Sequence, residues 1–264
     1  MCGRMTLTRS GSEIAEYFAA AMAELMAADA VQGANGGAPK ARFNITPSQD
    51  VLTVVPAPAG SGSLAEFAWK QWGLIPKWAK DPAMGQRMFN ARSETVAEKP
   101  SFRAAFKRRR CLVVADGFYE WTPRNKGHRP FFFQPAHEPM LTFAGLFEAW
   151  RGEGGEVIES CTVLTTEANA DLAEVHHRMP VVLTPDTAAT WLDMAVSAEE
   201  LGPLMKPAPA GTLTREAVTR YVNDPRHDDA RCMEPEPPMS RMAHAEQGAL
   251  FALDGGESGQ EEEF

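Results

Sequence analysis

Long hydrophobic runs and closely spaced cysteines are both missing from this sequence. No apolar run reaches the ~20 residues that a transmembrane helix needs. The first residues also lack the basic, apolar and small-residue segments of a secretory signal. The four cysteines are widely spaced and form no Cys-x-x-Cys pair, so no disulfide framework is indicated. We therefore expect a cytoplasmic protein that does not enter a membrane.

Basic residues are absent from the last 19 positions, which carry six acids: Glu246, Asp254, Glu257, Glu261, Glu262 and Glu263. The net charge of the whole chain, −9, by itself argues against a nucleic-acid partner. Without the acidic stretch, 29 of the 35 acids remain against 26 bases, a net charge of −3. We predict one domain over residues 1–235 and a disordered acidic tail over residues 236–264.

One basic run stands out against this acidic background. It is KRRR at residues 107–110, and Arg103 lies one helical turn before it. Cations near the end of a helix interact favourably with the helix dipole. We interpret most of these side chains as the solvated end of a short helix.

Short strand-like runs separated by turn signals make up most of the chain. Helices are expected after a capping box at Ser10 and Glu13, and at roughly 101–108, 169–175 and 186–194. The expected strands are DVLTVV (50–55), LAEFAWKQW (64–72), RCLVVADGFYEW (110–121), PFFFQP (130–135), MLTFAGLFEAW (140–150) and SCTVLTT (160–166). This spacing predicts a single α+β domain with a curved, largely antiparallel sheet or open barrel and inserted helices.

The second residue is a cysteine, in Met1-Cys2-Gly3-Arg4. Initiator methionine is usually removed when a small residue follows, which would leave Cys2 with both a free α-amine and a thiol. Unperturbed, these groups titrate near ~8 and ~8.5, not far above neutral pH. A frayed terminus without a function is the alternative.

Glu120 lies between two aromatic residues in the strand-like run VVADGFYEW. Strand alternation places it on the face opposite Tyr119 and Trp121. It is either an exposed strand glutamate or a carboxyl in an aromatic cleft, where desolvation would raise its pKa and suit it to proton transfer.

Two further segments place polar groups close together. In FNARSETV, Asn90, Arg92 and Glu94 alternate along one face of an expected strand, where they could bind an anion or simply face solvent. In EVHHRMP, His176 and Arg178 lie at the edge of an expected strand. No partner ligands occur at metal spacing, so we expect neither a metal nor a cofactor. Three tryptophans that we expect to be exposed could stack on bases beside these arginines: Trp72, Trp78 and Trp121, with core packing as the alternative for Trp72.

Six motifs occur in an order that resembles one protein family. They are CGR at the start, RFNITP (42–47), WGLIPKW (72–78), NARSET (90–95), DGFYEW (116–121) and HHRMP (176–180). Together with VNDPRHDDARCMEP (222–235), they make the chain similar to the SRAP (SOS-response-associated peptidase) family of abasic-site processing proteins. The resemblance covers residues 2 to about 235.

The resemblance implies a covalent reaction with DNA in the response to DNA damage. Cys2, exposed after removal of Met1, would join an abasic site in single-stranded DNA through a thiazolidine ring. The implied catalytic residues are Cys2, Asn90, Glu120 and His176. The implied DNA-binding residues are Arg4, Trp78, Arg92, Trp121, Thr165 and Arg178. Peptidase activity toward the protein's own Met1 and lyase-like activity are also implied, and we expect a monomer associated with the nucleoid when bound to DNA.

Two positions depart from the family pattern. Ala79 stands where the second residue of an aromatic pair is common, which removes one expected base-stacking contact. His177 stands where the family often has an acid. Neither belongs to the implied catalytic set.

Three other functions remain as alternatives. Class II glutamine amidotransferases also use an N-terminal cysteine, but here Arg4 replaces their usual isoleucine, and the only Asn-Gly, Asn35-Gly36, lies in a glycine-rich stretch. A true peptidase and a non-covalent binder of single-stranded DNA are the other two. Glutamine turnover identifies the first, and a denaturing gel separates a covalent adduct from non-covalent binding.

Overall fold

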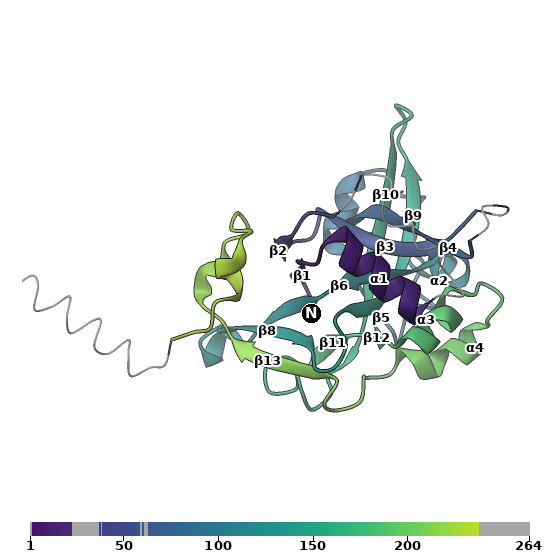
Figure 1. The fold of residues 1–264 in the computed structure, drawn as a ribbon. Coiled ribbons are helices and arrows are strands. Elements are labelled where there is room, and N and C mark those ends of the chain that lie inside the picture. Colours follow the sequence, from purple (N-terminus) through teal and green to yellow (C-terminus); the bar gives the residue numbers. More distant parts are fainter. Residues whose placement is uncertain (1, 23–36, 38, 59, 61–62, 238–264) are drawn as a thin grey trace, which may run out of the picture.

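The computed structural model describes residues 2–22, 37, 39–58, 60 and 63–237 (Figure 1). Their backbone forms two sheets with short helices at the edges. In the five-stranded sheet the strand order is β13-β8-β7-β1-β2. In the second sheet it is β11-β10-β4-β3-β6-β9-β12, and β5 pairs with β10 beside this path.

The five-stranded sheet carries the N-terminal end of the chain. Every neighbouring pair of its strands is antiparallel. Its members are β1 (Met5–Leu7), β2 (Arg42–Ile45), β7 (Gly117–Trp121), β8 (Pro130–Pro135) and β13 (Leu213–Ala217). Phe118 of β7 stacks on Phe133 of β8 with ring centroids 5.2 Å apart, which ties the two strands together at the core.

The second sheet is larger and mixes strand directions at one place. β10 runs parallel to β4 and β5, whereas the other pairings in this sheet are antiparallel. Its strands are β3 (Asp50–Pro56), β4 (Ala65–Trp72), β5 (Asn90–Arg92), β6 (Arg110–Ala115), β9 (Leu141–Arg151), β10 (Val157–Glu167), β11 (Arg178–Pro180) and β12 (Val182–Leu183). The predicted fold class, a single α+β domain with largely antiparallel strands and inserted helices, is confirmed.

The helices are short. The α-helices are α1 (Gly11–Ala21), α2 (Arg103–Arg108), α3 (Pro185–Leu192) and α4 (Ala198–Leu201). The described residues also form the 3-10 turns η1 (Pro82–Arg87), η2 (Arg124–Lys126), η3 (Gly202–Met205), η4 (Arg220–Asn223) and η5 (Ala230–Met233). The predicted capping box opens α1, since the Ser10 hydroxyl accepts from the Glu13 N–H and the Glu13 carboxylate accepts from the Ser10 N–H.

The expected strand over residues 110–121 is divided at Asp116, where the chain passes from the second sheet into the first. The Asp116 carboxylate accepts hydrogen bonds from the Thr6 hydroxyl and from the backbone N–H of Thr8. Because both donors belong to the N-terminal segment, Asp116 fixes β1 beside β7, and so fixes the start of the chain.

The helix expected over residues 169–175 is wrong, because this segment forms turns. The Asp171 carboxylate accepts from the backbone N–H groups of Gly211 and Leu213, some forty residues away. Asn169 donates to the carbonyl of Ala208. These long-range bonds hold the backbone in turns, and the sequence around residue 170 contains no sign of them.

Burial confirms some expectations about the core and corrects one. Cys111 and Cys161 lie fully buried in strands, as predicted. Trp72, expected to be exposed, is fully buried, and its ring N–H donates to the Phe89 carbonyl. Within the described residues, no helix combines the length and apolar character needed to span a bilayer. Most of the predicted acidic tail, residues 238–264, lies outside the described residues.

Candidate active site

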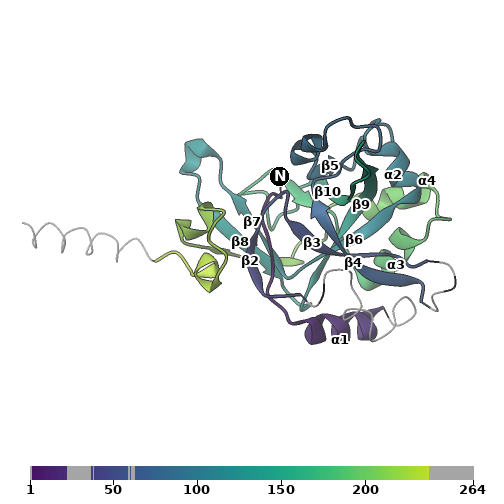
Figure 2. The same cartoon turned by 90° about the horizontal axis from the view of Figure 1, so that it is seen from above.

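Cys2 lies immediately before β1, next to the strand that carries Glu120. β1 and β7 are antiparallel with Met5 opposite Phe118, and the Tyr119 N–H donates to the Arg4 carbonyl at 3.0 Å. The same register, continued toward the N-terminus, brings Gly3 opposite Glu120. The pairing therefore brings the start of the chain to the glutamate that the sequence singles out, and Figure 2 shows the N-terminal end between β7 and β5.

Asn90 contacts Cys2 directly. Its side-chain N–H donates to the Cys2 carbonyl at 2.6 Å. β5 pairs with β10, with Asn90 opposite Val163, so the amide is held on a rigid sheet. The other amide atom, Oδ1, is buried and accepts no hydrogen bond within the described part of the chain. It is an acceptor placed beside Cys2 that could take a hydrogen bond from an amine or a sugar hydroxyl.

Glu120 is buried, with 4% of its surface exposed. This decides between the two interpretations left open by the sequence, since an exposed strand glutamate would lie in solvent. Burial raises the pKa of Glu120 above the usual range of a glutamate. The His176 Nδ1 lies 3.9 Å from the Glu120 Oε1, so a second titratable group adjoins the carboxyl.

His176 completes the group around Cys2. Burial lowers the pKa of His176, so the neutral imidazole is favoured near neutral pH. Burial also raises the pKa of the Cys2 thiol, and the adjacent negative charge of Glu120 adds to this. In this arrangement the thiol is protonated and fully covered. A nucleophilic role therefore requires that the site open and that a neighbouring group accept the thiol proton.

Arg178 is largely buried and already engaged. Its guanidinium donates to both carboxylate oxygens of Glu94, at 2.6 and 2.9 Å, and to the Thr165 carbonyl at 2.6 Å. These hydrogen bonds lower the pKa of Glu94. β5 ends at Arg92, so Glu94 lies in the following turn and not on the predicted strand face. The sequence indicated both residues but not that they pair.

Arg92 and Trp78 remain available at the surface. Arg92 ends β5 opposite Thr165 of β10, is exposed, and makes no ion pair with a described residue. Trp78 follows β4 and is 57% exposed, which is uncommon for so large an aromatic side chain. Both retain the accessibility that a phosphate contact and a base-stacking contact need.

Arg4 and Trp121 make contacts to the segment formed by residues 218–237. The Arg4 guanidinium donates to the Asn44 side chain at 2.7 Å and to the Val222 carbonyl at 2.6 Å. It also lies 5.6 Å from the centroid of the Trp121 ring. The Trp121 ring N–H donates to the Asn223 side chain at 2.8 Å. Both residues thus hold the C-terminal segment against the five-stranded sheet.

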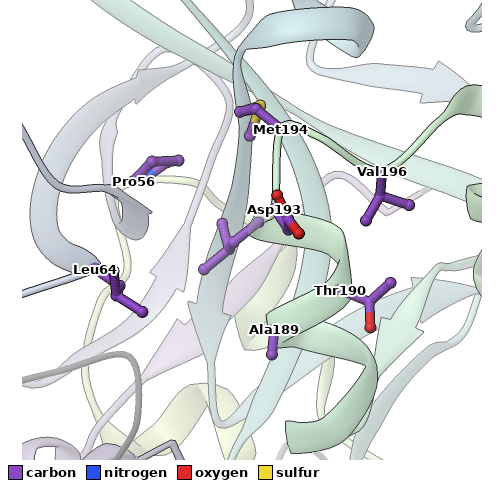
Figure 3. A pocket seen from close by; sticks show the side chains of 8 residues that line it. Pro56, Leu64, Ala189, Thr190, Asp193, Met194 and Val196 are labelled. Carbon is purple, nitrogen blue, oxygen red and sulfur yellow. The ribbon is translucent and has the colours of Figure 1, made fainter.

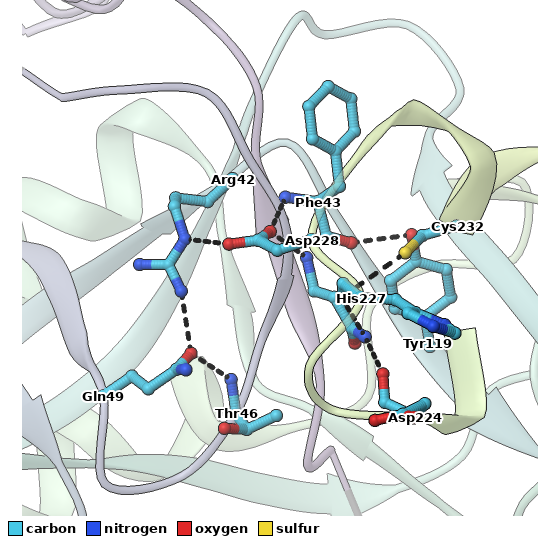
Figure 4. Close-up of polar contacts among 10 residues, drawn as sticks. Arg42, Phe43, Thr46, Gln49, Tyr119, Asp224, His227, Asp228 and Cys232 are labelled. Atoms are coloured by element: carbon cyan, nitrogen blue, oxygen red, sulfur yellow. Dashed lines mark hydrogen bonds and ion pairs between the residues drawn. The ribbon is translucent and has the colours of Figure 1, made fainter. Parts of the chain in front are cut away.

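Asp228 belongs to this same segment and ties it to β2. Its carboxylate pairs with Arg42 and accepts from the backbone N–H groups of Phe43 and Asn44 (Figure 4). The Tyr119 hydroxyl donates to the Phe43 carbonyl nearby. RFNITP (42–47) includes β2 and the turn that follows it. Its structural role is to receive the segment that closes the fold some 180 residues later.

Two cavities lie outside the Cys2 group. One, of about 510 Å³, is lined by α3 and by Pro56 and Leu64, and it contains no predicted site residue (Figure 3). The other, of about 320 Å³, opens beside Glu94 and is also lined by Thr166, Glu167 and Lys206. Across the described residues, no three His, Cys, Asp or Glu side chains come together as a metal-binding set.

The fold and the site define a two-sheet protein whose N-terminal cysteine lies against a buried glutamate, an asparagine and a histidine. The family model described as "SOS response associated peptidase (SRAP)" matches residues 1–225. The chain belongs to this family.

Named relatives share much of the sequence. The "Abasic site processing protein YoaM" of Bacillus subtilis is 34% identical over 238 residues, which cover 89% of this chain and 99% of the relative. The "Abasic site processing protein HMCES" of Gallus gallus is 36% identical over 190 residues, covering 62% of this chain and 56% of that protein. A solved structure from Bacteroides thetaiotaomicron, 21% identical, superposes with a TM-score of 0.72 over 89% of this chain and all of the other, which shows the shared fold.

Proposed function

We propose that this protein processes abasic sites by forming a covalent link between Cys2 and single-stranded DNA. The observation that carries the proposal is the group around Cys2: Asn90 bonded to its carbonyl, and the Glu120–His176 pair beside it. The relatives are named as abasic site processing proteins, which supports the same substrate class. The family's name adds a possible peptidase activity, for which the most direct substrate is the protein's own Met1.

The reaction begins at the ring-opened abasic sugar, which carries an aldehyde. Once Met1 has been removed, the α-amine of Cys2 condenses with this aldehyde, forms a C=N bond and releases one water. The thiol sulfur then adds to the same carbon, and its proton is transferred to the nitrogen. The product is a five-membered thiazolidine ring, which contains both the nitrogen and the sulfur of Cys2.

The neighbouring side chains supply the proton transfers. Glu120, with its pKa raised by burial, accepts the thiol proton and returns it to nitrogen. Asn90 holds the Cys2 backbone and offers its buried Oδ1 to the amine or to a sugar hydroxyl. His176, kept neutral by burial, assists formation or reversal of the C=N bond. The lyase-like activity that the family resemblance implies would proceed through the same C=N intermediate.

DNA is held by cations and aromatic rings around this group. Arg92 binds a backbone phosphate, and Trp78 stacks on a flanking base. Thr165 lies on β10, next to β5, and Arg178 on β11, the strand beyond, where Glu94 balances the charge of Arg178. Arg4 and Trp121 contribute mainly by holding the C-terminal segment, because their polar groups already have protein partners.

The test is cross-linking of a single-stranded oligonucleotide that contains one abasic site. Wild-type protein should give a heat-stable adduct on a denaturing gel. Cys2→Ser keeps the amine but cannot close the sulfur ring, so it should give only a labile product that borohydride traps. An equal amount of heat-stable adduct with Cys2→Ser would exclude the thiazolidine. Non-covalent retention alone would identify a binding protein.

A further inference from the structure

A group of cations lies away from the Cys2 group, on α2 and the residues that flank it. The stretch 99–110 contains six of the chain's 26 Lys and Arg and no acid: Lys99, Arg103, Lys107, Arg108, Arg109 and Arg110. Arg110 is buried, where its guanidinium donates to the Trp191 carbonyl. Arg103, Lys107 and Arg108 are exposed. A chain with a net charge of −9 therefore concentrates positive charge on one short helix.

These exposed cations are not neutralised by neighbours. Elsewhere on the surface, arginines pair with acids, as Arg215 does with Glu174 and Arg231 with Asp229. Among the described residues, no ion pair involves Arg103, Lys107 or Arg108. Unpaired like charges repel one another, and a polyanion bound across them would relieve that repulsion.

A buried acid connects α2 to the segment that presents Trp78. Glu148 of β9 is buried, and one of its carboxylate oxygens accepts from Arg109, at the end of α2. The other lies 3.9 Å from the Lys77 Nζ. The Trp150 ring N–H, also from β9, donates to the Ala79 carbonyl. β9 therefore holds the Trp78 segment and the end of α2 next to each other.

The Cys2 site, β5 and α2 follow one another in space along one side of the molecule. Figure 1 and Figure 2 both place β5 between the N-terminal end and α2. β5 carries Asn90 and Arg92, and the turn that follows it leads directly into α2. α2 packs on β6 and β9 of the same sheet, so its position relative to the site is fixed.

We propose that Arg103, Lys107 and Arg108, together with Lys77, form a second DNA contact surface, which binds the phosphates of the single strand leaving the Cys2 site past Trp78. This proposal rests on the proposed function. It adds a track of non-specific phosphate contacts beyond the reacting nucleotide. Long exposed cationic side chains suit this task, because phosphate contacts need charge and reach and not a fixed geometry.

The experiment measures equilibrium binding of undamaged thymine oligonucleotides of increasing length, at several salt concentrations. The test variant is Lys107→Gln with Arg108→Gln. The control, Arg9→Gln with Lys40→Gln, removes the same charge before α1 and before β2, two elements that lie away from α2 in Figure 2. Thermal unfolding of both variants confirms that they fold.

Wild-type protein should gain affinity once the oligonucleotide is long enough to extend beyond the site. The test variant should lose this gain. The slope of log K against the logarithm of the salt concentration should become shallower by about 1.4, because two phosphate contacts are lost and each contributes ~0.7. The control should match wild type. A test variant that keeps the whole gain in affinity, with an unchanged salt slope, overturns the second surface. Failure of wild-type protein to bind any single strand would instead overturn the proposed function.

Discussion

Glu120 combines burial with a position beside both Cys2 and His176. Burial raises its pKa, so part of the population keeps its proton at a pH where an exposed glutamate is fully ionised. Glu120→Gln preserves the shape and removes the titration. We expect cross-linking to slow by about 10²–10⁴-fold, with little change in DNA affinity. As a base, Glu120 must be ionised, so the wild-type rate should rise with pH through its pKa, and the variant should lack this acidic limb.

The free energy of unfolding provides an independent check on the same residue. A carboxyl whose pKa is raised on folding binds more protons in the native state, so its contribution to stability is lost as pH rises through the native pKa. Above that pKa, Glu120→Gln should be the more stable protein, and the difference should shrink toward acidic pH. Parallel loss of DNA binding and cross-linking in this variant would indicate a structural role instead.

Arg4 holds the segment that closes the fold, residues 218–237, against the five-stranded sheet. Arg4→Ala removes a donor from the Asn44 side chain and from the Val222 carbonyl; the buried Asn44 Oδ1 loses its partner, whereas the Val222 carbonyl still accepts from the Asn44 Nδ2. We expect a loss of about 1–3 kcal/mol in the free energy of unfolding. Arg92→Ala is the matched comparison, because Arg92 is exposed and without an ion pair within the described residues. It should leave stability unchanged and lower the salt slope of single-strand binding by about 0.7.

Urea unfolding and salt-dependent binding of the two variants distinguish these roles. The reverse pattern, with Arg4→Ala affecting only the salt slope, would restore Arg4 as a phosphate contact and remove its proposed packing role.

Local patterns in the sequence predicted elements well wherever neighbouring residues determine them. Strand-like runs bounded by turn signals located β3, β4 and β8 almost to the residue, and the Ser10 capping box located the start of α1. Prediction failed where hydrogen bonds to residues far away in the sequence determine the local structure. Asp171 holds its segment in turns through bonds to Gly211, and Arg178 pairs with Glu94 across 84 positions. Such pairs have no local signature, so the sequence indicated the site residues but not their partners.

At the scale of the whole molecule, the two sheets bring four distant segments to one place. Cys2 comes from the residues that lead into β1, Asn90 from β5 and Glu120 from β7, and His176 comes from the turn before β11. No single element contains a complete site. The sheets therefore fix the position of Cys2 near a chain end that would otherwise be expected to fray. The proposed function requires this, because the amine and the thiol of Cys2 must reach the same carbon.

The intact mass of the protein after incubation with an abasic single-stranded oligonucleotide tests the central claim most directly. A thiazolidine requires a mass equal to the chain without Met1 plus the oligonucleotide, less one water, and this mass should not change when borohydride is added. A Schiff base would gain two hydrogens under the same treatment. An adduct that retains Met1, or no adduct at all, would contradict covalent capture through the Cys2 amine and thiol.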